Sequence, residues 1–116
     1  MNRNNRRAPR KTIGGIIPVR NALTETSMGR IGNLSRTGLM LICPLVTHDN
    51  ALYQLTFEFP SPNNHVQKIE VGVQALWCSE TSTAGQYWAG FRFISIAAED
   101  AKTINGWMSR PDFATT

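Results

Sequence analysis

Two segments in the middle of the chain alternate between apolar and polar residues, and this alternation constrains the fold more than any other feature. One face of residues 51–59 is formed by Tyr53, Leu55, Phe57 and Phe59. One face of residues 66–77 is formed by Ile69, Val71, Val73, Ala75 and Trp77. A period of two residues is typical of a β-strand with one buried face. The chain is therefore expected to be mainly β.

Turn-forming residues divide the rest of the body into further short apolar runs. Four more strands are expected at residues 16–23, 28–34, 38–42 and 87–94, with loops at 60–64 and 79–85. Pro18 lies inside the first run, which indicates an edge position or a bulge there. Short alternating strands separated by turns favour a barrel or sandwich, and closing the sheet removes its exposed edges.

The period changes near the C-terminus. Helical spacing relates Ala97, Ala101, Ile104 and Met108, which predicts a helix over residues 97–108. Acidic residues 99 and 100 would lie in its first turn, and Pro111 prevents its continuation. This helix is expected to cover one opening of the barrel, with Trp107 or Met108 as the plug.

Positive charge is concentrated at the N-terminus. Residues 1–11 contain five basic residues and no acidic one, and the other residues contain 7 basic and 8 acidic ones. A folded domain that binds nucleic acid would carry its Lys and Arg side chains across one face. The concentration of positive charge at the N-terminus instead favours a flexible arm that closes over a compact anion. A solvated arm, or one that contacts nucleic acid or acidic lipid loosely, is the alternative.

Length and composition indicate one domain. We expect a basic arm at residues 1–11, a barrel with its helix at 12–110 and a tail at 111–116. No apolar run reaches the roughly 18–20 residues of a membrane span, and the N-terminus has no apolar signal region. Cys43 and Cys78 are isolated and are expected to be reduced thiols in a cytoplasmic protein. Membrane insertion is not expected.

The sequence offers no recognisable catalytic or metal-binding constellation. His48 and His65 have no cysteine or carboxylate at zinc-ligand spacing. Ser35 is not in a Gly-x-Ser-x-Gly context, and residues 14–15 lack the Lys-Ser/Thr of a phosphate-binding loop. A protein that is not an enzyme and needs no cofactor or metal is therefore expected.

Two short motifs carry the chemistry of recognition. Arg6 and Arg10 are four residues apart, and the turn from Asn33 to Gly38 begins 23 residues after Arg10. A planar guanidinium can donate two parallel hydrogen bonds to the O6/N7 edge of guanine or to phosphate, which lysine cannot do. Asn and Ser side chains stabilise compact turns. By itself such a turn would be read as a polar strand connector.

Arg-x-x-x-Arg followed by Asn-x-Ser-x-x-Gly resembles the PilZ domain, a bacterial module that binds cyclic diguanylate. Trp77 and residues 90–93 (Gly-Phe-Arg-Phe) also resemble the family, so that the similarity extends over most of the chain. The resemblance implies a six-stranded antiparallel β-barrel with a C-terminal α-helix. At Asn33 the family more often has Asp; Asn keeps the carbonyl acceptor and adds a donor.

The resemblance also implies a site and a function. The ligand-binding residues would be Arg6, Arg10, Asn33, Ser35 and Gly38, with Arg7 and Trp77 as further contacts. Gly38 is expected to adopt positive φ, and Trp77 to lie either in the core or against a guanine. Arg36 is expected to face water. The protein would be a second-messenger receptor whose arm becomes ordered on cyclic diguanylate and which then engages an unidentified downstream protein.

Two alternatives remain at this point. A small barrel with a basic arm could bind single-stranded nucleic acid, although such barrels interleave aromatic and basic residues across one sheet face. We therefore do not expect nucleic acid as a partner. The chain could also be a PilZ-like interaction module that does not bind the nucleotide. In such modules the arginine motif is expected to be broken, whereas in this chain it is intact.

Overall fold

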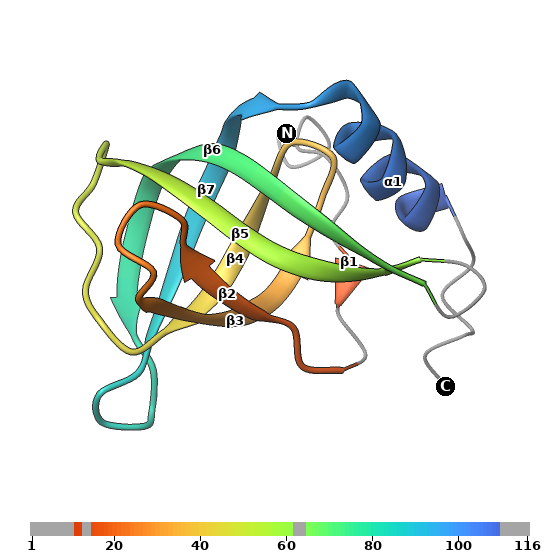
Figure 1. Ribbon diagram of the computed structural model, residues 1–116. Helices are drawn as coiled ribbons and strands as arrows, with labels where there is room; N and C mark the ends of the chain where they lie inside the picture. The colour runs from red at the N-terminus through yellow and green to blue at the C-terminus, as the bar shows by residue number, and fades with distance from the viewer. Residues whose placement is uncertain (1–10, 13–14, 62–64, 110–116) are drawn as a thin grey trace, which may run out of the picture.

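The computed structural model describes residues 11–12, 15–61 and 65–109. Strands account for most of the described residues, and one helix follows them (Figure 1). The elements, in order, are β1 (Lys11–Thr12), β2 (Pro18–Asn21), β3 (Ser27–Leu34), β4 (Gly38–Cys43), β5 (Leu52–Ser61), β6 (His65–Glu80), β7 (Tyr87–Ile96) and α1 (Ala98–Ser109).

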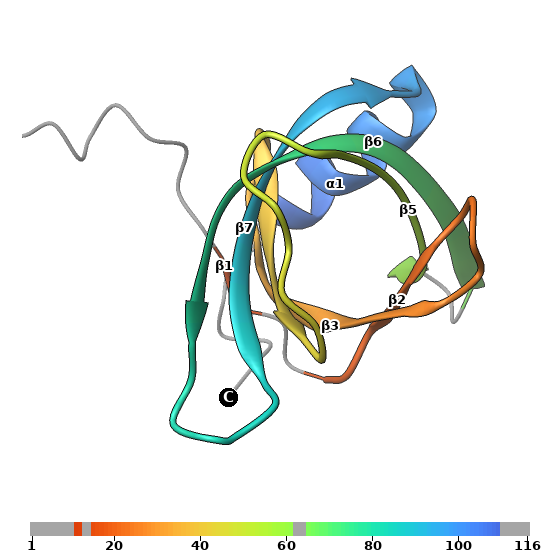
Figure 2. The ribbon, with the colours of Figure 1, turned by 90° about the vertical axis from the view of Figure 1, so that its left-hand side faces the viewer.

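Six of the strands close into an antiparallel barrel. The order around the ring is β3-β2-β5-β6-β7-β4, and pairing between β3 and β4 completes the circle. Figure 2 shows this ring with the interior in view. The predicted six-stranded barrel is therefore confirmed. The two-residue strand β1 lies outside the ring and pairs with the end of β3.

The alternating segments fill the barrel as their pattern predicts. Leu55, Phe57 and Phe59 of β5 are at most 3% exposed. On β6, the predicted inward residues from 69 to 75 are fully buried. Burying a side chain of this size contributes about 1.5–3 kcal/mol relative to leaving it exposed, so these two strands supply much of the apolar burial of the core.

Helix α1 covers one end of the barrel (Figure 1). Ile104 is its fully buried residue, at 1% exposure, so the plug is one turn earlier than predicted. Trp107 packs edge to face on Phe59, with ring centroids 5.5 Å apart. Gln67 of β6 fixes the helix start, because its Nε2 donates to Asp100 Oδ1 at 2.9 Å.

Some strands end at other residues than predicted, because a side-chain hydrogen bond or a pairing partner determines where the strand stops. β2 ends at Asn21 rather than at residue 23, because Asn21 Oδ1 accepts a hydrogen bond from Leu23 N at 2.9 Å and starts a turn. Pro18 begins β2, and a register shift follows between Val19 and Arg20, as Pro18 led us to expect. β6 continues to residue 80 instead of ending in a loop, because its last residues pair with the start of β7.

Candidate functional site

The turn between β3 and β4 is organised around the Ser35 hydroxyl. Ser35 Oγ accepts hydrogen bonds from the backbone N–H groups of Thr37 at 3.2 Å and Gly38 at 3.1 Å. The Ser35 backbone N–H donates to Gly38 O at 2.9 Å. Ser35 is only 1% exposed. The hydroxyl therefore holds the loop in one shape from inside.

Gly38 is needed for a close approach between strands rather than for an unusual backbone angle. The glycines with positive φ in the described part of the chain are Gly29 and Gly85, so the expected positive φ at Gly38 is wrong. A Cβ at position 38 would collide with the carbonyl oxygen of Phe91 on β7. Glycine therefore lets the turn lie directly against the β7 backbone.

Asn33 lies on the outer face of the barrel at the end of β3. Its neighbour Leu34 points into the core and is fully buried, whereas Asn33 is partly exposed. Asn33 pairs with Met40 on β4, and its Nδ2 lies 3.8 Å from Met40 Sδ. On the other side of β3, Asn33 is aligned with Thr12 of β1.

Strand register connects Asn33 to Trp77 across the barrel surface. Trp77 of β6 is aligned with Gly90 of β7, Gly90 with Met40 of β4, and Met40 with Asn33 of β3. We call Trp77, Gly90, Met40 and Asn33 the outer row. Two residues that sequence reasoning assigned to the ligand thus lie on one face.

Trp77 is not in the core. A register shift between Ala75 and Trp77 turns the side chain out of the apolar face of β6, and it is 41% exposed. The indole lies on the backbone of Gly90, where any Cβ would collide with its ring atoms. A partly exposed, supported indole is suited to stacking on a planar base.

The turn also contacts the end of the helix. Arg36 Nη2 donates a hydrogen bond to Ser109 Oγ at 3.1 Å, so the side chain does not simply face water. The positive charge lies near the C-terminal end of α1, where the helix dipole favours cations and where the last turn has no basic residue of its own.

The arm residues Arg6, Arg7 and Arg10 lie outside the described residues. The structure does show where the chain that follows them joins the barrel: Lys11 of β1 is aligned with Leu34, and Thr12 with Asn33. The residue after Arg10 is therefore fixed beside the Asn33 turn.

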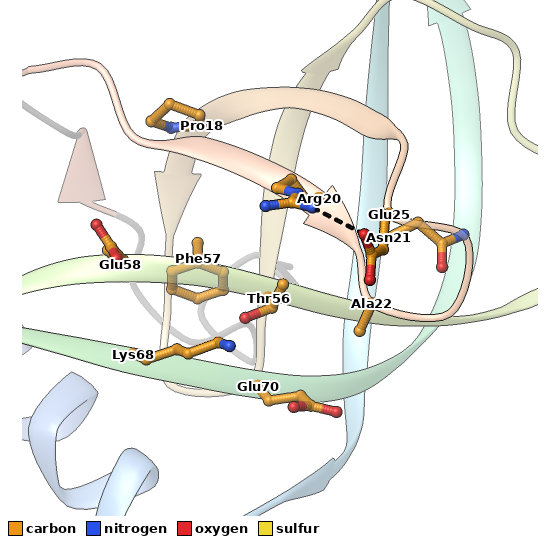
Figure 3. Close-up of a pocket in the computed structure, with 10 residues that line it drawn as sticks. All are labelled: Pro18, Arg20, Asn21, Ala22, Glu25, Thr56, Phe57, Glu58, Lys68 and Glu70. Atoms are coloured by element: carbon orange, nitrogen blue, oxygen red, sulfur yellow. Dashed lines mark ion pairs between the residues drawn. The ribbon is translucent and has the colours of Figure 1, made fainter.

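A pocket of about 550 Å³ opens elsewhere, on the outside of β2, β5 and β6 (Figure 3). Arg20 and Glu25 form an ion pair at 3.6 Å on one side of it, and Lys68 and Glu70 lie on the other. None of the sequence-predicted site residues lines this pocket. Its mixture of acids and bases gives it no single charge with which to attract a nucleotide.

The described part of the chain offers neither a metal site nor a membrane-spanning helix. It contains no cluster of three or more His, Cys, Asp or Glu side chains arranged to hold a metal ion. None of its helices is long and apolar enough to cross a membrane.

Sequence reasoning missed Met40 and the placement of Gly90 and Arg92 on the outer face of β7. Met40 belongs to an ordinary apolar strand, and only the register between β4 and its neighbours places it beside Asn33. The Gly-Phe-Arg-Phe segment was the available signal for the other two.

Solved structures confirm the fold. The inhibitor of motility MotI/DgrA from Bacillus subtilis superposes with a TM-score of 0.74 at 16% identity, over 92% of this chain and 49% of that one. The present chain thus spans about half of that protein. The PilZ domain of YcgR from Escherichia coli, solved with c-di-GMP, superposes with a TM-score of 0.61 at 12% identity, over 85% of each chain.

No curated protein matches the sequence. The PilZ domain model matches residues 4–110, which include Arg6, Arg10 and the turn from Asn33 to Gly38. PilZ domains are cyclic diguanylate receptor modules and not enzymes. With a match over nearly the whole sequence and the six-stranded barrel with its C-terminal helix, the chain belongs to the PilZ domain family.

Proposed function

We propose that this chain binds cyclic diguanylate between its N-terminal arginine arm and the outer row, and that ordering of the arm passes the signal to a partner protein. The observation that carries the proposal is the pairing of β1 with the end of β3. It aligns Lys11, the residue after Arg10, with Leu34 next to Asn33, which supports a site shared by two motifs that are far apart in sequence.

Different residues are assigned to different groups of the ligand. Arg6 and Arg10, with Arg7 as a further contact, donate to guanine O6/N7 edges and to phosphate oxygens. Asn33 meets a guanine edge with its amide, and Trp77 stacks on a guanine face. These roles need side chains on the outside of the barrel, where Asn33 and Trp77 both lie.

Ser35 and Gly38 act mainly by shaping the turn. The Ser35 hydroxyl holds two backbone N–H groups, and Gly38 brings the turn against β7. Both therefore keep Asn33 and the backbone around it in the geometry that the nucleotide meets.

Transmission follows from the cost of ordering the arm. Residues 1–11 contain few apolar side chains, and fixing each backbone residue costs about 1–2 kcal/mol. Only charge-assisted bonds to the ligand can offset that cost, so the arm is ordered when the nucleotide is bound. The altered surface then engages a downstream protein. A cytoplasmic setting is part of this proposal and agrees with the unpaired thiols of Cys43 and Cys78.

Isothermal titration with three nucleotides tests the proposal. We expect cyclic diguanylate to bind far more tightly than cyclic diadenylate or linear guanosine nucleotides. Adenine presents a donor where guanine presents O6, so an arginine fork fits it poorly. Equal affinity for the two cyclic dinucleotides would contradict guanine recognition by the arm.

A further inference from the structure

Arg92 lies on the same outer face as the proposed nucleotide site, although the two motifs do not include it. Its neighbours on β7 alternate with it: Ala89 and Phe91 are fully buried, so Gly90 and Arg92 point outward. Arg92 is aligned with Gly38 on β4. The backbone of residue 92 is thus beside the turn and two residues from Gly90 of the outer row, and its side chain is directed towards Gln74 of β6.

Gln74 holds the Arg92 side chain through Nε and leaves the two terminal nitrogens of the guanidinium available. Arg92 Nε donates to Gln74 Oε1 on β6 at 2.8 Å. Gln74 points outward too, because Val73 and Ala75 on either side of it are fully buried. Among the described residues, neither terminal nitrogen of Arg92 has a hydrogen-bond partner. Those nitrogens are the pair that binds an anion in two parallel bonds.

The position of Arg92 complements that of the arm. β1 brings the arm to the β3 side of the turn, at Leu34 and Asn33, and Arg92 lies on the β7 side, at Gly38. Two residues along an antiparallel strand span about 6.8 Å. Since Arg92 Nε bonds Gln74 of β6, the guanidinium lies towards the strand that carries Trp77, about two residues along from the indole. A guanidinium beside the indole, rather than over it, is suited to the ribose–phosphate ring of a nucleotide whose base stacks on Trp77.

We propose that Arg92 is a further ligand-binding residue, which grips the ribose–phosphate ring of the nucleotide from the side opposite the arm, and that Gln74 is its positioning residue. This inference rests on the proposed function and names a contact that the two motifs do not contain. The same guanidinium limits the site to anionic ligands even where a base alone could stack.

Affinity for cyclic diguanylate, measured by titration of the whole chain, tests the contact. Loss of a charge-assisted hydrogen bond costs about 1.5–3 kcal/mol, so Arg92→Ala should weaken binding by about 10- to 100-fold. Arg92→Lys keeps the positive charge but cannot donate two parallel hydrogen bonds, so it should retain more affinity than Arg92→Ala but less than the unmodified chain. Arg20→Ala is the matched control, because Arg20 is an exposed arginine on β2 away from the outer row, and it should change affinity less than about 2-fold.

Gln74 variants separate positioning from a merely structural role. Gln74→Glu keeps an acceptor for Arg92 and adds an ion pair, so the β6–β7 link and the melting temperature should be preserved. The new carboxylate neutralises the guanidinium and repels phosphate, so affinity should fall by about 10-fold or more. In an Arg92→Ala background, Gln74→Ala should have no further effect.

The outcomes distinguish this inference from the function on which it rests. If the unmodified chain does not bind cyclic diguanylate, both are overturned. If it binds and Arg92→Ala binds equally well, only the role of Arg92 is overturned. If Gln74→Glu binds as tightly as the unmodified chain, the guanidinium of Arg92 does not act on the ligand through its charge. If Gln74→Ala in the otherwise unmodified chain binds equally tightly, the positioning role of Gln74 is overturned.

Discussion

At the scale of single residues, the absence of a side chain at position 90 decides how Trp77 is presented. The indole lies where a Cβ of residue 90 would be, and Met40 and Asn33 continue the same row. Gly90 therefore contributes to the site without offering any side-chain atom to a ligand.

Gly90→Ala should weaken cyclic diguanylate binding by displacing the indole. Stacking of a base on an aromatic side chain is worth about 1–3 kcal/mol, and most of that should be lost. Titration measures the affinity, and tryptophan fluorescence reports the change around Trp77 when Trp88 and Trp107 are replaced by Phe in both proteins. Gly106→Ala is the control, because a Cβ there meets nothing within 4 Å. Unchanged affinity in Gly90→Ala would show that Trp77 does not stack on the ligand.

Burial determines the pKa of the Cys43 thiol. It is 1% exposed, and desolvation, helped by the nearby Cys78 thiol, raises the pKa of Cys43 to about 12 from a usual value of 9.0. The folded state thus prefers the neutral thiol. Its contribution to stability is complete below about pH 9 and is lost as the pH rises towards 12.

We expect the melting temperature of the unmodified protein to fall between pH 9 and pH 11. Relative to its own value at pH 8, the melting temperature of Cys43→Ala should fall less over the same range. In the native protein, iodoacetamide at pH 8 should modify the partly exposed Cys78 well before Cys43. Equal rates of modification for the two thiols would contradict the protection that burial gives to Cys43.

At the scale of secondary-structure elements, local patterns predicted the strands well and their irregularities poorly. The alternation in β5 and β6 identified the inward residues up to Ala75. It failed at Trp77, because a bulge depends on how β6 pairs with β7 and not on the residues of β6 alone. β1 gave no local signal, since a two-residue strand exists only through its partner β3.

The N-terminal arm and the contact between the turn and the helix are expected to differ in how much they contribute to ligand binding, and two arginines test this. Arg10 immediately precedes β1, whereas Arg36 donates to Ser109 at the end of α1. Arg10→Ala should weaken binding by about 1–3 kcal/mol. Arg36→Ala should change binding little and lower stability by about 0.5 kcal/mol, because its bond is exposed. Titration and thermal melts measure the two effects, and equal losses of affinity would contradict this division.

At the scale of the whole molecule, the barrel closes without β1, the strand into which the basic segment leads. The ring closes through the β3–β4 pair, and β1 is not part of it. The sequence predicted the composition of each part: apolar strands after residue 15, and positive charge before residue 12. It could not predict the outer row, because the alignment of Trp77 with Asn33 depends on the register of four strands, which form two hairpins far apart in the chain.

Deletion of residues 1–11 tests the central claim most directly, through titration of cyclic diguanylate into the truncated and the full-length protein. We expect the truncated barrel to keep its circular dichroism spectrum and to lose detectable binding, because the core is intact and the guanidiniums of Arg6 and Arg10 are gone. A truncated protein that is folded and binds with an affinity close to that of the full-length chain would contradict the claim that the arm holds the nucleotide.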